Sequence, residues 1–192
     1  MMKKTKMAKG LSKVVWLLGL GSLVLFLTVG CGAEQDDPST DRTVSRDFGS
    51  YTVPAGWVRS DKYSTEDKVF YLLAGHEDDK EPDNVSVEMG ENRYGADEHE
   101  KFRMAILSQI SAQLEGVDNV ALTGYGSNTE AGDVYYAFTF TEDLGEGKQI
   151  ITRHFYIIGE KKYVLVHLTN FSGSEDTDKA AEKIAESFVW AE

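Results

Sequence analysis

The 192-residue sequence has only one cysteine, Cys31, so it cannot form an intramolecular disulfide. It also lacks the signatures of several enzyme classes. No G-x-S-x-G nucleophile elbow, P-loop or dinucleotide-binding fingerprint is present, and we interpret the glycine-rich segments 124–126 and 145–147 as hairpin turns. We therefore predict no catalytic residues and no cofactor.

Basic residues are scarce in most of the chain. The first 31 residues contain five lysines and no acidic residue, which leaves 15 of the 20 basic residues against all 32 acidic ones, a net charge of −17. Such a charge repels phosphate groups and argues against nucleic acid and anionic head groups as partners. It attracts cations and basic surfaces, although solubility is the simpler interpretation of an acidic surface.

A hydrophobic run over residues 14–29 follows the lysine-rich start and ends in Leu27-Thr28-Val29-Gly30-Cys31. The run is shorter than the ~20 residues that span a bilayer and is typical of a signal peptide. The ending resembles a bacterial lipobox, where diacylglycerol is attached to cysteine and the chain is cut before it. We predict a signal peptide over 1–30 and lipidation of Cys31. The alternative is an uncleaved membrane helix.

Lipidation would hold the protein on the extracytoplasmic face of the cell membrane, because several acyl chains together give stable anchoring. We favour the surface of a Gram-positive cell over the periplasm. Residues 32–45 are polar with one isolated valine, so they cannot bury enough apolar surface to fold alone. We predict a flexible tether over 31–45 and one folded domain over 46–192.

Hydrophobic periodicity predicts the elements of this domain. Strands are expected at 51–53, from 57–58, and at 69–73, 84–89, 120–125, 133–142, 149–158 and 163–171, and helices at 97–115 and 174–188. We expect Asp97 and Ser174 to cap the two helices. The strands at 149–158 and 163–171 are apolar on both faces, which indicates the middle of a sheet covered on two sides. The order predicts an α+β fold with a mainly antiparallel sheet.

The domain resembles the PsbP/Mog1-like proteins, which include DcrB-like bacterial lipoproteins. The resemblance depends on the segment 51–57 (YTVPAGW), the single central helix, the paired hydrophobic strands and the ending 185–190 (AESFVW). It implies an α/β/α sandwich with two helices that serves as an accessory or binding module, usually without catalytic activity. It supplies no active-site positions.

Two histidines form the best local constellation. In the hairpin that turns at 159–162, paired residues have numbers that sum to 321, which places His154 opposite His167. Two facing imidazoles could hold Zn²⁺ or titrate together, but the neighbouring residues offer no good third ligand. Partly buried structural histidines are the favoured interpretation. His76 and His99 are expected to be exposed.

The acidic loop at 77–83 could suggest calcium, but it lacks the D-x-D-x-D-G spacing of an EF-hand. We interpret it as a solvated loop and predict no metal site there.

Three function classes follow. We prefer a non-catalytic module that binds a protein or envelope component and is held at the membrane by its lipid. The alternative is a small-ligand or ion carrier, with a pocket lined by Tyr135, Tyr136 and the two strand histidines. An enzyme is the class that the sequence supports least.

Overall fold

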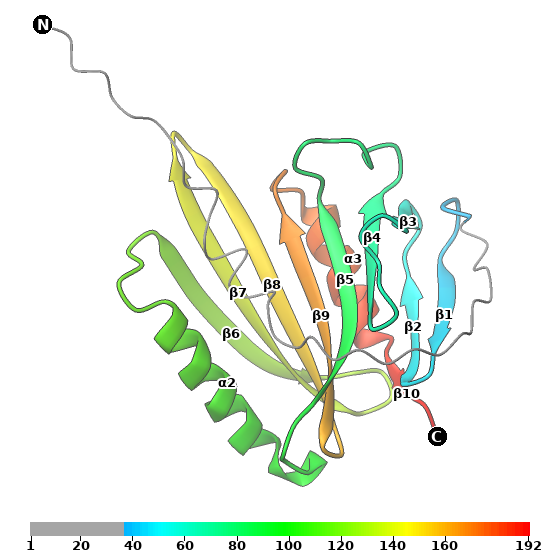
Figure 1. The fold of residues 1–192 in the computed structure, drawn as a ribbon, viewed down its shortest axis with the longest axis vertical. Coiled ribbons are helices and arrows are strands. Elements are labelled where there is room, and N and C mark those ends of the chain that lie inside the picture. Colours follow the sequence, from blue (N-terminus) through cyan, green and yellow to red (C-terminus); the bar gives the residue numbers. More distant parts are fainter. Residues whose placement is uncertain (1–36) are drawn as a thin grey trace, which may run out of the picture.

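The computed structural model describes residues 37–192, so Cys31, the predicted signal peptide and the first part of the predicted tether lie outside the described residues. The elements, shown in Figure 1, are β1 (Arg42–Arg46), β2 (Gly49–Val53), β3 (Trp57–Arg59), β4 (Lys68–Leu73), β5 (Asn84–Glu91), the 3₁₀ turn η1 (Ala96–Glu98), α2 (His99–Gln113), β6 (Val120–Asn128), β7 (Val134–Gly145), β8 (Lys148–Gly159), β9 (Lys162–Asn170), α3 (Glu175–Glu186) and β10 (Val189–Trp190).

These strands form two sheets. The larger has seven strands in the order β3-β4-β5-β9-β8-β7-β6, and the smaller has the order β1-β2-β10. Every strand pair is antiparallel. The predicted α+β class with two helices and an antiparallel sheet is therefore confirmed.

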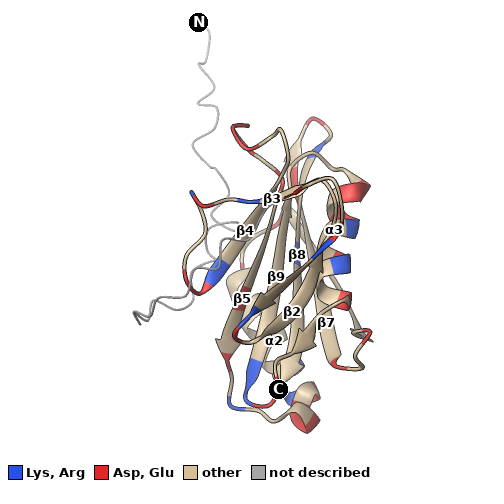
Figure 2. Ribbon diagram, turned by 90° about the vertical axis from the view of Figure 1, so that its right-hand side faces the viewer, with Lys and Arg blue, Asp and Glu red and all other residues tan. Residues whose placement is uncertain are grey.

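Side-chain alternation divides the core into two parts. On one face of the large sheet, α3 and the small sheet cover a core that includes Phe155, Ile157 and Phe188. On the other face, α2 covers a smaller core around Phe102 and Tyr156. In the side view the charged positions lie mainly in α3 and the loops, while most strand ribbon is uncharged (Figure 2). The sheet is thus covered on both faces, as the strands apolar on two sides predicted.

The two helices begin in different ways. The Ser174 hydroxyl accepts a hydrogen bond from the Asp176 backbone N–H at 3.2 Å, so the predicted cap of α3 is confirmed. Asp97 does not cap α2, and that prediction was wrong. The chain first forms η1, and there the Glu98 carboxylate accepts from the Gly95 N–H at 3.3 Å. This bond stabilises η1, while α2 itself begins without a side-chain cap.

Two boundaries differ from expectation. The segment 42–45, predicted as tether, belongs to β1, because pairing with β2 satisfies its backbone while Val44 alone is buried. The segment 124–126, interpreted as a turn, lies within β6 and pairs with β7 without interruption. Glycine in that segment serves packing, as described below. The turn predicted at 145–147 does join β7 to β8, with φ of 79° at Gly145 and 75° at Gly147.

Candidate functional site

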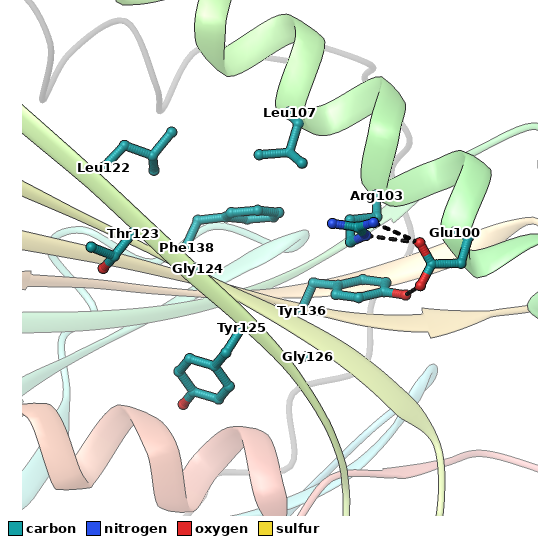
Figure 3. A pocket seen from close by; sticks show the side chains of 10 residues that line it. All are labelled: Glu100, Arg103, Leu107, Leu122, Thr123, Gly124, Tyr125, Gly126, Tyr136 and Phe138. Carbon is teal, nitrogen blue, oxygen red and sulfur yellow. Dashed lines mark hydrogen bonds and ion pairs between the residues drawn. The ribbon is translucent and has the colours of Figure 1, made fainter.

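A groove lies between α2 and the outer strand of the large sheet. Its volume is about 450 Å³. Figure 3 shows that α2 provides one wall and that β6 and β7 provide the other. The lining residues are Glu100, Arg103, Leu107, Leu122, Thr123, Gly124, Tyr125, Gly126, Tyr136 and Phe138.

Two glycines shape this groove. Gly124 pairs with Phe138 and Gly126 with Tyr136 across the β6–β7 ladder. A Cβ at Gly124 would lie 2.9 Å from Phe138 Cδ1, and one at Gly126 would lie 2.9 Å from Tyr136 Cε1. The two aromatic rings therefore occupy the space that side chains on β6 would fill. They form an apolar floor and leave the backbone of β6 exposed.

One end of the groove is polar. The Tyr136 hydroxyl donates to Glu100 Oε1 at 2.9 Å, and Arg103 contacts Glu100 Oε2 at 2.9 Å. His99 Nδ1 lies 2.8 Å from the same hydroxyl. Because the hydroxyl hydrogen is donated to Glu100, Nδ1 must carry a hydrogen and donate it to the Tyr136 oxygen. His99 was expected to be merely exposed. It is instead half-buried and bonded to Tyr136.

The hydrogen bonds at this end shift the pKa values of Glu100 and Tyr136 in opposite directions. The bond from Tyr136, with that from Arg103, lowers the pKa of Glu100. Burial, with the bond to the Glu100 carboxylate, raises the pKa of Tyr136 to about 12. At neutral pH Glu100 is an anion and Tyr136 a neutral donor. The arrangement suits hydrogen bonding and recognition, because each of these groups already has a partner within the cluster.

The sequence-predicted histidine pair is present but lies outside the groove. His154 pairs with His167, and the ring centroids are 4.7 Å apart. His167 Nε2 lies 3.1 Å from Thr169 Oγ1. Burial lowers the pKa of His154 to about 3 and depresses that of His167 well below its ordinary value. Both rings are neutral and structural, and they are more deeply buried than the partly buried histidines that the sequence predicted.

No third ligand joins this pair. Among residues 37–192, no group of three His, Cys, Asp or Glu side chains is close enough to hold a metal ion. The pocket suggested for Tyr135, Tyr136 and the histidines does not form, because the two tyrosines point to opposite faces of the sheet. Tyr135 instead donates to Glu186 of α3 at 3.4 Å. Adjacent residues of a strand point to opposite faces, so the alternation of β7 already separates Tyr135 from Tyr136.

The acidic loop contains one residue that we misjudged. Asp83 is only 8% exposed and accepts hydrogen bonds from the backbone N–H groups of Phe171 and Ser172 and from the Thr177 hydroxyl. It joins the start of β5 to the connection between β9 and α3. Asp83 is therefore a structural carboxylate, while 77–81 are exposed as predicted. The sequence offered no signal that would separate it from its neighbours.

Comparison with known proteins shows similarity in fold alone. No protein-family model and no curated protein matches the chain. The solution structure of cyanobacterial PsbP (CyanoP) from Synechocystis sp. PCC 6803 has 16% identity and a TM-score of 0.48, over 85% of this chain and 98% of that one. A crystal structure of PA94 from Pseudomonas aeruginosa, a protein of unknown function, has 11% identity and a TM-score of 0.47, over 78% of this chain and 96% of that one.

No helix within residues 37–192 is long and apolar enough to cross a membrane.

Proposed function

We propose that the chain is a lipoprotein held at the extracytoplasmic face of the cell membrane through Cys31, and that its domain is a non-catalytic module that binds a protein or envelope component. The lysine-rich start, the apolar run and the cysteine after Gly30 support the anchor. The lone thiol lies at the position that lipidation would modify.

The groove beside β6 is the observation that carries the binding role. It combines an apolar lining, which includes Phe138, Leu122 and Leu107, with one ordered polar end, a composition common in recognition sites. It lies at the edge of the large sheet, where the backbone of β6 is also accessible. The polar groups satisfy one another and present no nucleophile beside a free base, so the chemistry favours binding over catalysis.

One experiment in cells tests the anchor and the module together. The full chain is expressed with Thr123→p-benzoylphenylalanine, which places a photoreactive group on β6, and with Cys31 either intact or changed to Ser. We expect the intact chain to fractionate with membranes at the mass of a lipidated protein, and light to produce one cross-linked adduct of defined mass. Cys31→Ser should give soluble protein or uncleaved precursor.

The matched control is Glu77→p-benzoylphenylalanine, an exposed position in the loop between β4 and β5. It should give no adduct. Unmodified Cys31 in the membrane fraction would refute the anchor. Equal adducts from both positions, or none from either, would refute the binding role of the groove.

A further inference from the structure

The outer edge of β6 is an open strand edge. β6 is the last strand of the large sheet, and no strand within residues 37–192 pairs with its outer side. Its nine residues, VALTGYGSN, contain no charged residue and no proline, and its pairing with β7 has no bulge. Natural proteins usually protect an open edge with charged residues, proline or a bulge, because an open edge is a template for another strand. An unprotected edge of this length is therefore suited to strand addition.

The opposite edge provides an internal contrast. It is formed by β3, which has three residues and ends at Arg59. Arg59 lies 3.4 Å from the Asp61 carboxylate, so charge gathers at the end of this short edge. Shortness and charge are two common forms of edge protection. The β3 edge is thus protected against strand addition in the usual way, whereas the β6 edge beside the groove is not.

A strand added to β6 would point alternate side chains into the groove. On the α2 side these side chains would meet Leu107, Leu122 and Phe138, which are apolar. Because neighbouring residues of a strand point to opposite faces, every second residue of the added segment would be buried there. The remaining residues would face α3.

The α3 side carries negative charge level with Tyr125. Figure 3 shows that the Tyr125 side chain points away from α2 and towards α3. Its hydroxyl donates to Glu182 at 3.1 Å. Lys179 pairs with Glu175 and Asp176, and no cation among residues 37–192 forms an ion pair with Glu182. A cationic side chain placed beside Tyr125 could therefore form an ion pair with the Glu182 carboxylate.

Two residues earlier in β6, the nearby charge on this side of the sheet is positive. Thr123 lies opposite Thr139, and the Thr139 hydroxyl accepts from Arg153 Nε at 3.2 Å. The cationic residue is thus expected level with Tyr125 and not level with Thr123. A second copy of this chain would instead bring together two chains that each carry a net charge of −17 over residues 32–192, which electrostatic repulsion opposes.

We propose that β6 binds an extended peptide segment of a partner by strand addition, with apolar residues in the groove and a lysine or arginine beside Tyr125 and Glu182. The inference rests on the proposed binding role and specifies its partner chemistry. Main-chain hydrogen bonds to β6 supply affinity, while the groove and Glu182 select the side chains.

The test uses the purified full chain in a neutral detergent and a fluorescent probe peptide of the length of β6 that alternates valine with lysine. We expect saturable binding by fluorescence anisotropy and slower deuterium uptake in residues 120–128, measured by mass spectrometry. Two control peptides are required. One replaces lysine with glutamate, and the other carries N-methyl groups on alternate amides, which removes strand pairing but keeps the charge. Both should bind at least about tenfold more weakly. Micelles without protein provide the blank.

Three variants distinguish a specific effect of the Glu182 charge from a general effect of net charge. Glu182→Lys should weaken binding of the probe by about tenfold, and Glu182→Gln, which keeps an acceptor for Tyr125, by a smaller factor. Glu77→Lys has the same change of charge far from β6 and should leave the affinity within about twofold. Equal losses in Glu182→Lys and Glu77→Lys would show non-specific attraction and overturn the proposal.

Two further results would also overturn it. The first is undiminished binding of the N-methylated peptide. The second is protection of residues 120–128 that rises with protein concentration without peptide, which would make a second copy the occupant. If the Thr123 adduct forms in cells while the probe fails, the binding role stands and only the peptide chemistry is refuted.

Discussion

The two faces of the large sheet are packed to different degrees. Among residues 37–192, the α3 face holds twenty buried residues in one hydrophobic cluster, whereas the α2 face holds eight. The first is closed by two elements, α3 and the small sheet β1-β2-β10, and the second by α2 alone. Burial of apolar surface is the main stabilising term, so most of the stability resides on the α3 face. The α2 face, closed by one helix, retains the groove.

The helices match this difference. α3 presents Ala180, Ala181 and Ala185 to the sheet, and these small residues allow close approach. α2 buries only Phe102 and Ile110 completely. A helix with two such anchors covers part of a sheet and leaves space beside it. Our proposal that one face mainly stabilises the fold and the other binds a partner can be tested by substitution.

The largest effect is expected from matched truncations on the two faces. Phe188→Ala should lower the free energy of unfolding by about 3–5 kcal/mol. Phe188 is enclosed between Phe48 and Trp190, so its truncation would leave a cavity. Phe102→Ala should cost about 2–3 kcal/mol, because α2 can settle towards the sheet. Urea unfolding measures both. An equal or larger loss for Phe102→Ala would contradict the comparison.

An effect of intermediate size is expected from pH, through the two histidines on the α2 face. Burial holds the pKa of His154 at about 3 and that of His167 well below 6.5, so the unfolded chain binds more protons. Stability is fully present above pH 6.5 and is lost as pH falls towards the folded-state values. Each histidine contributes a loss of up to about 1.4 kcal/mol per pH unit in this range.

The control for this effect is the double variant His154→Phe/His167→Leu, which removes both titrating groups. Its free energy of unfolding should change much less between pH 6.5 and 5 than that of the wild type. The exposed carboxylates with lowered pKa, such as Glu98 and Glu100, titrate below this window and do not mask the result. Identical slopes for the two proteins would show that the imidazoles are not buried as neutral rings.

The smallest effect is expected at the floor of the groove. Gly126→Ala would place a methyl group 2.9 Å from Tyr136 Cε1, and the bonds of Tyr136 to Glu100 and His99 restrain the ring. The strand gains from replacement of glycine, so the net loss should be about 1 kcal/mol or less. The free energy of binding in the groove should be reduced by more than the free energy of unfolding. Ser127→Ala, next to it on β6, is the control for thermal unfolding and binding.

The sequence contains enough information to predict most strands and the histidine pair. Strict alternation at 134–140 predicted β7, and the turn position alone fixed His154 opposite His167. These are local patterns, in which the period of the strand and the length of the turn decide the outcome. The same holds for Ser174, whose hydroxyl acts on the helix that follows directly.

The groove could not be predicted in the same way. It depends on Gly124 and Gly126 lying opposite Phe138 and Tyr136, and glycines separated by one residue also fit a turn. β1 was missed because it buries only Val44 and is formed through pairing with β2. In both cases the deciding contact lies in another strand, so no local period reveals it.

The small sheet has a consequence for how this chain can be re-engineered. β1 and β10 flank the same strand, β2, near its residues Gly49 and Ser50. With neighbouring strands about 4.8 Å apart, the first and last strands of the described fold lie roughly 10 Å from one another. The two strands run parallel to each other, so a linker from the end of β10 would have to pass back along β1 to its start at Arg42, which about ten residues could span. The chain could then be reopened at the exposed turn at 145–147. Such a circular permutant would keep every strand pair of both sheets while moving the attachment point to the end of the β7–β8 hairpin.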